Sequence, residues 1–427
     1  MIISVLVDNS MTGGTTDNPE TDTLTCLLDL LSMYTKYSYK IFTTDPRVYS
    51  VHYINNIIEL WDVIDTSTDT LCELIHVGDP CGIIDTPFYQ RVYSFKKLDM
   101  YGFVEHTFND TYRDNDPCTS NVLYRYERCN QYEYDLLTLL RSIISTGERR
   151  IDRTGTGTLS LFGSQMEIDI SAQFPLITTR KMSLRMIFEE LMMFIRGQTD
   201  SKVLEQRNVN VWSGNTTRSF LDSRGLYHYR EGDMGPTYGF MFRHAGADYR
   251  GCDTNYTGQG YDQLLEAIRL IRTDPYSRRI MINLWDSSKL DQMALPPCGF
   301  NYQFYVSDPE GAKLLSCKIT QRSSDISLAG GWNIASGALL TYMIARMTGT
   351  IPHKLIWSVG DVHIYSNQVH SVVEQLERKP HPLPYVFFSE DAPSMSNGKD
   401  ITEFDYKKHV RLFGYEHHKF IRFSMNV

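Results

Sequence analysis

The segment at residues 182–197, MSLRMIFEELMMFIRG, restricts the fold more than any other part of the chain. Its composition predicts a helix that ends at Gly197, and apolar residues occupy almost every side of that helix. A helix of this kind is stable inside a large core, with other elements packed around it. We therefore expect a sizeable domain in which this helix is buried.

Further helices and strands alternate irregularly around this segment. Periodic apolar residues predict three more helices, at 132–146, 261–274 and 333–349. Apolar runs typical of β-structure predict four strands, at 159–170, 280–285, 301–306 and 313–320. The connection SDPEGA between the last two strands indicates a hairpin. Strand pairs mixed with long helices predict an α+β domain rather than a regular βαβ series.

The composition favours two domains. The 427 residues are 42% hydrophobic, enough for two cores. The first part of the chain is rich in Asp, Thr and Tyr, and residues 109–121 are typical of a surface loop that leads into a linker. We predict a small first domain at 1–128 and a larger domain at 129–427.

Charge and cysteine pattern exclude several classes of protein. A net charge of -9 argues against a chain that wraps a nucleic-acid backbone. Without a run of about 18 apolar residues or a basic leader, we expect a soluble cytoplasmic protein with no membrane partner. The eight cysteines form no CxxC pair, so we predict no metal site and a reducing compartment.

Two carboxylates stand in the apolar helix. Glu189 has Arg185 one turn earlier, which predicts an ordinary ion pair. The neighbours of Glu190 one turn away are apolar, and desolvation there raises the pKa of a carboxyl group. A structural role and a proton-transfer role in a closed site deserve about equal weight from this pattern alone.

Cys298 lies in the motif PPCGF, where two prolines stiffen the approach to a strand. A cysteine at such a rigid edge with guanidinium groups nearby is a candidate thiolate nucleophile. Taken alone, a buried inert thiol is the better interpretation, because cysteine is so often a core residue.

Several arginines lie in loops with Ser, Thr and Gly: Arg153, Arg278 with Arg279, and Arg322 next to Ser323. The planar guanidinium fork suits a phosphate, although each arginine alone is more often a solvated surface charge. Asn333 comes at the start of a predicted helix and is by default an N-cap.

Together, these segments resemble the thymidylate synthase family in order and spacing, from about residue 130 to Val427. The similar stretches are DRTGTGTLSLFG, FPLITTRK, GQTDSKVL, GDMGPTYGF, DPYSRRI, MALPPCGFNYQFYV, QRSSD, NIASGALLTYM, GDVHIYSN and SMNV. The resemblance implies an α+β thymidylate synthase fold with a mixed, mainly antiparallel sheet at the interface of a homodimer.

The resemblance also implies a reaction, the reductive methylation of dUMP to dTMP. The family uses 5,10-methylenetetrahydrofolate as one-carbon and hydride donor, without a metal, and releases dihydrofolate. Cys298 matches the nucleophile that adds to C6 of uracil, with Arg322 beside it to favour the thiolate. The other positions that match dUMP ligands are Arg153, Gln321, Ser323, Asn333, His363 and Tyr365, with Arg278 and Arg279 reaching the neighbouring subunit's phosphate.

Further matches concern proton transfer and the folate. Glu190 matches the family's acid and base, and Tyr238 matches the tyrosine involved in removing the C5 proton. Asp325 matches a residue with both catalytic and cofactor contacts. The remaining matches to the folate site are Arg180, Lys181, Trp212, Asn215 and Val427, the last in a segment that closes over the ligands.

The chain departs from the family pattern at three places. Gly299 stands where a His usually follows the nucleophile, and Asn426 replaces the usual penultimate Ala. The usual Gly-Leu-Pro-Phe before Asn333 is replaced by Ala329, Gly330, Gly331 and Trp332. These changes concern cofactor affinity and turnover more than the class of reaction.

Residues 1–128 resemble a shortened dihydrofolate reductase. The strand-like KIFT, the helix-like NNIIELWDVI and the strand-like CELIHV carry the resemblance, but VGDP at residues 77–80 replaces the reductase Gly-Gly pair. We interpret this part as a small α/β reductase-like domain that is degenerate and noncatalytic. The alternatives for the whole chain are a bifunctional dihydrofolate reductase-thymidylate synthase, a deoxynucleotide hydroxymethylase and a nonenzymatic binding protein.

Overall fold

The computed structural model describes residues 130–426 except Arg153 and Ala172, together with the backbone of six earlier strands. These strands are β1 (Ile2–Val7), β2 (Ser38–Thr43), β3 (His52–Tyr53), β4 (Cys72–Val77), β5 (Tyr89–Leu98) and β6 (Gly102–Phe108). The chain divides into two compact units. Unit 1 comprises Met1–Gln131, His381–Ser389 and Arg411–Glu416, and unit 2 comprises the remaining residues.

Unit 1 contains a six-stranded sheet in the order β3-β2-β1-β4-β5-β6. All its neighbouring strands are parallel except the last pair, β5 and β6. The predicted strands at KIFT and CELIHV are confirmed as parts of β2 and β4. The predicted helix at NNIIELWDVI and the VGDP turn beyond Val77 lie outside the described residues.

Unit 2 contains a second six-stranded sheet in the order β7-β8-β12-β11-β10-β9. Its strands are β7 (Glu148–Arg150), β8 (Thr158–Asp169), β9 (Met281–Asn283), β10 (Gly299–Ser307), β11 (Leu314–Asp325) and β12 (Ile351–Tyr365). Only β11 and β12 pair in parallel, which confirms the prediction of a mixed, mainly antiparallel sheet. β10 and β11 form the predicted hairpin.

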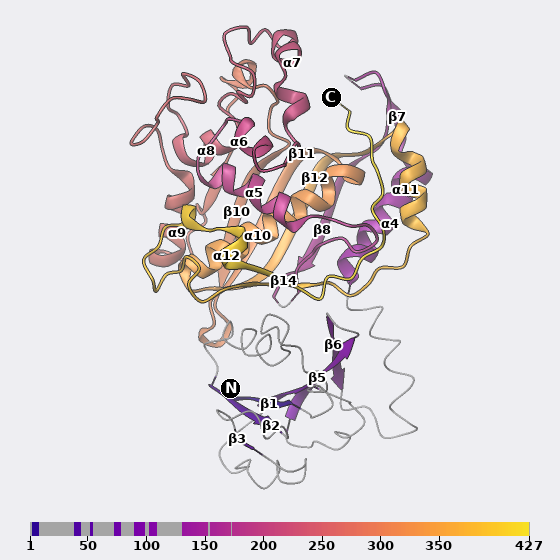
Figure 1. Ribbon diagram of the computed structural model, residues 1–427, viewed down its shortest axis with the longest axis vertical. Coiled ribbons are helices and arrows are strands. Elements are labelled where there is room, and N and C mark those ends of the chain that lie inside the picture. The colour runs from indigo at the N-terminus through magenta and orange to yellow at the C-terminus, as the bar shows by residue number, and fades with distance from the viewer. Residues whose placement is uncertain are drawn as a thin grey trace. The chain divides into compact units, whose positions relative to one another are not determined.

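The helices of unit 2 are α4 (Gln131–Thr146), α5 (Leu184–Ile195), α6 (Lys202–Glu205), α7 (Arg218–Ser223), α8 (Tyr238–His244), α9 (Gln263–Thr273), α10 (Gly331–Thr348), α11 (Val369–Leu376) and α12 (Tyr406–His409). In Figure 1, α5 and α10 lie across the sheet of unit 2, with α8 and α9 to one side and α4 and α11 to the other. None of these helices, nor any other in the described ranges, is long and apolar enough to cross a membrane. A short pair, β13 (Tyr385–Phe388) and β14 (Val410–Phe413), completes the described structure.

The apolar helix α5 is buried as predicted. Ser183 caps its N-terminus by accepting a hydrogen bond from the backbone N–H of Met186, and Gly197 follows it with φ of 71°. α10 packs on one side against α5 and on the other against β11 and β12. Gly349 ends α10 in the left-handed conformation, as the sequence indicates.

The predicted partner of Glu189 was wrong, and the default N-cap interpretation of Asn333, which the family resemblance already displaces, does not hold either. Glu189 forms its ion pair with Arg207, whereas Arg185 donates to the carbonyl oxygen of Arg207. Asn333 is not an N-cap, because α10 begins at Gly331 and is preceded by a π-helical turn at Ile326–Gly330. Both errors arise where a segment distant in sequence, or an irregular turn, supplies the contact that a local pattern cannot show.

Glu133 anchors the loop between β8 and α5. Its fully buried carboxylate accepts hydrogen bonds from the backbone N–H groups and the hydroxyls of Thr178 and Thr179. The same loop receives Gln375, which donates to the Thr179 hydroxyl at 2.9 Å. One carboxylate on α4 therefore fixes the backbone that carries Arg180 and Lys181.

We predict that Glu133→Gln lowers the free energy of unfolding by about 3 kcal/mol, because an amide N–H₂ faces donors that lose their acceptor. Urea denaturation of both proteins measures this difference. A matched control is Glu167→Gln, whose partner Lys354 lies in an exposed ion pair. That change is expected to lower the free energy of unfolding by less than about 1 kcal/mol. Equal effects of the two substitutions would contradict the anchoring role.

Candidate active site

The topology of the second sheet brings most of the predicted site residues to one edge. β11 and β12 run parallel, so their carboxyl ends meet, with Asp325 opposite His363. β10 runs antiparallel to β11, which places Gly299 opposite Gln321 and Cys298 beside the end of β11. β8 begins at the same edge, with Thr158 opposite Tyr365.

Cys298 is held by Arg322 and its neighbour. The guanidinium Nη2 of Arg322 lies 3.7 Å from the Cys298 sulfur and also donates to the Pro296 carbonyl oxygen at 3.0 Å. Nε of Arg322 donates to the Pro297 carbonyl oxygen at 3.0 Å. The hydroxyl of Ser323 lies 4.0 Å from the same sulfur. The Pro-Pro pair thus supplies the acceptors that orient a positive charge toward the thiol.

Tyr238, at the start of α8, contacts Cys298 from another direction. Its hydroxyl oxygen accepts a hydrogen bond of 2.9 Å from the backbone N–H of Cys298. The ring stacks on Phe194 of α5, with centroids 4.7 Å apart, and meets Trp212 edge-on. Burial, with Cys298 nearby, holds the pKa of Tyr238 well above its ordinary value. The phenol therefore stays protonated and can donate a hydrogen bond to a ligand.

Glu190 projects from α5 between two indole groups. Nε1 of Trp212 donates to one carboxylate oxygen at 2.8 Å, and Nε1 of Trp332 donates to the other at 2.6 Å. Burial raises the pKa of Glu190, and the bonds from Trp332 and Trp212 oppose that shift. The raised pKa agrees with the prediction made from its apolar neighbours, and it suits a group that exchanges protons.

Trp332 is a contact residue of Glu190 that sequence reasoning did not identify. It was noted only as a departure from the family pattern before Asn333. A tryptophan N–H is a natural partner for a buried carboxylate, but the sequence shows only the residue type and not the proximity of the two groups. The distance of 142 positions between the two residues hid their contact.

Asp325 and Gln321 are held within the protein. Asp325 caps the π-helical turn through the Leu328 N–H at 3.1 Å, and its other oxygen accepts a bond of 2.8 Å from Gln368. Gln321 is buried, and its side-chain oxygen accepts a hydrogen bond from the indole N–H of Trp357. Both side chains thereby have fixed positions at the end of β11.

His363 and Tyr365 lie on the same side of β12, with ring centroids 5.2 Å apart. Nδ1 of His363 lies 2.8 Å from a carboxylate oxygen of Asp361, whose other oxygen accepts from Arg150 at 3.0 Å. The Asp361 contact fixes the orientation of the imidazole and leaves Nε2 for another partner.

The residues predicted to meet the folate occupy different environments. Trp212 and Asn215 are buried. Arg180 is buried too, where its guanidinium donates to the Ser327 carbonyl oxygen at 2.8 Å and lies over the Phe423 ring. Lys181 is exposed. Of the two alternatives for the glutamate tail, Lys181 is the residue whose side chain faces solvent.

Two of the predicted residues do not join this group. Arg278 and Arg279 are exposed in the connection between α9 and the edge strand β9. Arg153 and Val427 lie outside the described residues. The structure therefore gathers Cys298, Arg322, Ser323 and the surrounding groups without either arginine of the 278–279 pair.

The structure shows the surroundings of Gly299 and Asn426, two positions that depart from the family pattern. A Cβ atom on Gly299 would lie 3.5 Å from the Gln321 side-chain nitrogen and 3.7 Å from the Tyr302 hydroxyl, so the position has room for a side chain. Asn426 accepts hydrogen bonds from Asn367 at 2.9 Å and from the Thr156 hydroxyl at 3.1 Å. The carboxyl-terminal segment is thus fastened to the turn before β8.

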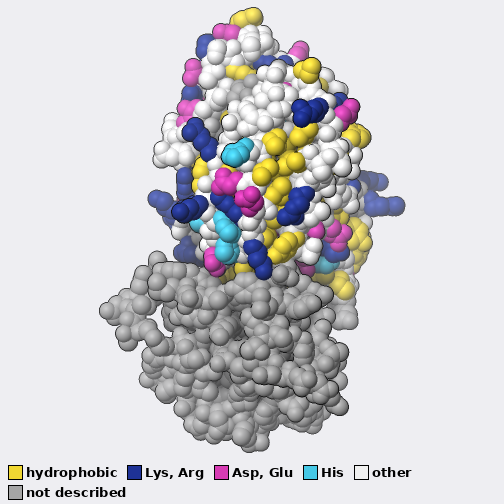
Figure 2. All heavy atoms as spheres, turned by 90° about the vertical axis from the view of Figure 1, so that its right-hand side faces the viewer, with side chains coloured by type: hydrophobic (Ala, Val, Ile, Leu, Met, Phe, Trp, Pro, Cys, Tyr) yellow, Lys and Arg dark blue, Asp and Glu magenta, His cyan; other side chains and the backbone are white. Residues whose placement is uncertain are grey.

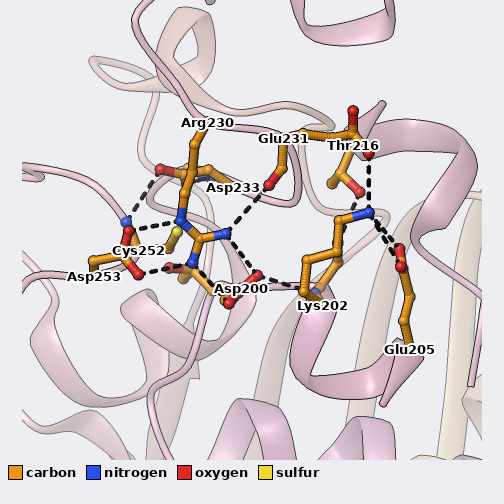
Figure 3. A network of polar contacts seen from close by, with 12 residues as sticks. Asp200, Lys202, Glu205, Thr216, Arg230, Glu231, Asp233, Cys252 and Asp253 are labelled. Carbon is orange, nitrogen blue, oxygen red and sulfur yellow. Dashed lines mark hydrogen bonds and ion pairs between the residues drawn. The ribbon is translucent and has the colours of Figure 1, made fainter. Parts of the chain in front are cut away.

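A separate polar cluster stabilises the segments around α6 (Figure 3). Arg230 binds Asp200 at 2.7 Å and Asp253 at 2.6 Å. The backbone N–H of Cys252 donates to the buried Asp233 at 3.1 Å. The charges in this cluster are paired with one another, which indicates a structural role.

The chain is similar to known proteins over most of unit 2. The family model described as thymidylate synthase matches residues 133–427. A thymidylate synthase of Agaricus bisporus is 46% identical over 299 residues, which cover 69% of this chain and 99% of that protein. The thymidylate synthase of Saccharomyces cerevisiae is 43% identical over 293 residues, covering 66% and 96%.

A bifunctional dihydrofolate reductase-thymidylate synthase of Zea mays is 44% identical over 302 residues, covering 71% of this chain. The chain spans only 56% of that relative's length. These matches and the α+β fold define an enzyme of the methyltransferase class. The chain belongs to the thymidylate synthase family.

The environments of three described cysteines lead to a labelling prediction. Burial, with Asp233 nearby, raises the pKa of Cys252 to about 12, and burial alone raises the pKa of Cys317 to about 12. At pH 8 roughly one in ten thousand of either thiol is ionised. We expect iodoacetamide at pH 8 to modify Cys298 before the other two, as measured by peptide mass spectrometry. Labelling in urea, where all three react, is the control, and equally fast native labelling of Cys252 would contradict the expectation.

Proposed function

We propose that residues 129–427 catalyse the reductive methylation of dUMP to dTMP, with 5,10-methylenetetrahydrofolate as donor of the one-carbon unit and the hydride. The observation that supports this most strongly is the position of the Cys298 sulfur, 3.7 Å from the Arg322 guanidinium and beside the end of β11. A positive charge at this distance stabilises a thiolate and can bind a phosphate as well. Family membership supplies the class of reaction.

In this proposal Cys298 attacks C6 of uracil, and C5 becomes the nucleophile for the one-carbon unit. Arg322 and Ser323 bind the phosphate together with Arg153, while Gln321 lies beside the base and phosphate. His363 and Tyr365 bind the ribose. Asn333 reads O4 and N3 of uracil, since an amide offers both an acceptor and a donor.

Glu190 orders water near O4 and passes protons, and Tyr238 assists removal of the C5 proton from its position on the Cys298 backbone. Trp212, Asn215 and Asp325 bind the folate, and Lys181 or Arg180 meets its glutamate tail. Val427 ends the segment that Asn426 fastens to Thr156, and this segment excludes water around the ligands.

We also propose a homodimer in which Arg278 and Arg279 complete the phosphate site of the partner. The sheet of unit 2 exposes large apolar side chains, among them Phe162 at 87% and Tyr305 at 67%. Exposed residues of this size on one sheet are typical of a surface that another subunit covers. Separately, Figure 2 shows hydrophobic side chains in a band between charged residues on the side of unit 2 that lies to the right in Figure 1.

For residues 1–128 we propose a noncatalytic, reductase-like domain that supports assembly or stability. Asp79 would repel the phosphate of a nicotinamide cofactor, and Pro80 lacks a backbone N–H to bind it. We expect the full chain to show no dihydrofolate-dependent oxidation of NADPH. Measurable reductase activity that disappears when residues 1–128 are deleted would overturn this proposal.

A cytoplasmic location is a further proposal, supported by the free thiols of Cys252, Cys298 and Cys317. Fractionation of cells that express the tagged chain tests it, and recovery in a membrane or secreted fraction would contradict it.

A spectrophotometric assay of dihydrofolate formation tests the main proposal. The full chain is expected to turn over dUMP and not dCMP, because Asn333 matches the donor and acceptor pattern of uracil. Cys298→Ala is expected to bind dUMP without forming dihydrofolate. Cys252→Ala is the matched control and is expected to keep its turnover, because that thiol lies in the separate cluster. Turnover by Cys298→Ala would refute the role of this thiol.

The shared phosphate site is tested by mixing two inactive variants. Cys298→Ala carries intact arginines, and the double change Arg278→Ala and Arg279→Ala carries an intact thiol. After subunit exchange, half of the dimers are mixed, and each has one site with neither defect, so activity should recover to about a quarter of the wild type. No recovery after exchange has been verified by native mass spectrometry would refute shared sites.

A further inference from the structure

The carboxylate of Glu190 has one indole donor on each oxygen, and the two donors come from different parts of the chain. Trp212 precedes a short 3-10 turn at Ser213–Thr216, and Trp332 lies in the first turn of α10. The bond from Trp332 is the shorter of the two, 2.6 Å against 2.8 Å. Each oxygen therefore has a fixed direction, and the plane of the carboxylate is set by both indoles together.

The segment before Trp332 is built to bring α10 close to its neighbours. A Cβ atom on Gly331 would lie 2.1 Å from Cδ1 of Ile177, and one on Gly330 would lie 2.9 Å from Cγ1 of Ile326. Neither position accepts a side chain without a shift of its surroundings. The π-helical turn at Ile326–Gly330 adds an irregularity that sets the start of α10. Together these features direct the indole of Trp332 toward α5.

We infer that Trp332 is a positioning residue for Glu190, which links the carboxylate on α5 to the base-reading amide of the adjacent Asn333. The inference rests on the proposed function, because it assumes that Glu190 handles protons near the uracil ring. Trp332 itself need not touch the substrate. Its indole N–H holds the carboxylate at a fixed distance from the first turn of α10, which also carries Asn333.

The polar groups around Glu190 determine how loss of the hydrogen bond from Trp332 changes the pKa of Glu190. Among the described residues, Tyr238 of α8 and Tyr302 of β10 are titratable groups near it, and burial raises the pKa of both. On its own helix, Glu189 is paired with Arg207. Because these neighbouring groups are neutral or already paired, the two indoles are the principal hydrogen-bond donors to the ionised carboxylate of Glu190. Removing one of them raises the pKa of Glu190 further, because the ionised carboxylate loses a hydrogen bond.

The test uses Trp332→Phe in the full chain, since phenylalanine keeps an aromatic ring and lacks the N–H. We expect kcat for dUMP to fall about tenfold while KM for dUMP changes by less than about threefold. The acidic limb of the plot of kcat against pH is expected to move to higher pH by about one unit. Trp332→Leu, which removes the ring as well, is expected to shift the limb by the same amount.

A control and a double variant separate this role from packing. Tyr342→Phe removes another buried donor from α10, the hydroxyl that donates to the Ile170 carbonyl oxygen at 2.8 Å. It is expected to lower the melting temperature without moving the acidic limb. In a Glu190→Gln background, Trp332→Phe is expected to change kcat by less than about twofold, because the group it positions is already altered.

The outcomes are distinguishable. An unmoved acidic limb in Trp332→Phe, with only Trp332→Leu impaired, would reduce Trp332 to a packing residue and overturn the inference. An equal loss from Trp332→Phe in the wild type and in Glu190→Gln would overturn it too. Wild-type turnover by Glu190→Gln would instead refute the proposed role of Glu190 itself.

Discussion

The burial of α5 is the constraint on which the rest of unit 2 depends. A helix that is apolar on almost every side has to be covered by other elements, and here α10 and α8 pack against it. Covering the helix leaves Glu190 only partly exposed to water. A lone carboxylate in that place would be costly, so the site depends on the indoles of Trp212 and Trp332 to stabilise it.

The second constraint is the register of the sheet. Because β11 and β12 are the parallel pair among antiparallel neighbours, the ends of four strands meet at one edge. Residues from 298 to 365 thereby converge without a long loop. The thiol lies at the start of β10, and the arginine that orients toward it lies at the end of β11. Short, rigid connections suit a site whose reacting atoms have to keep fixed positions.

Much of this arrangement could be predicted from local pattern. The helix at 182–197, the hairpin around SDPEGA and the end of α10 at Gly349 follow from apolar spacing and from glycine. The raised pKa of Glu190 followed from its apolar helical neighbours. The ion pair of Glu189 with Arg207 and the hydrogen bond of Trp332 to Glu190 could not be predicted from local pattern, because both contacts form through tertiary packing. The resemblance to the family identified Cys298, which local reasoning alone had treated as a core thiol.

The account makes Cys298 the covalent centre of the site, and intact mass spectrometry tests this claim most directly. The full chain is incubated with 5-fluoro-dUMP and 5,10-methylenetetrahydrofolate and is then digested for peptide mapping. The covalent complex is expected to persist, because fluorine at C5 cannot be removed as a proton is. The account predicts one adduct per active site on the peptide that contains Cys298, and none in Cys298→Ala. An adduct on another cysteine, or formation of dTMP by a chain that gives no adduct, would contradict it.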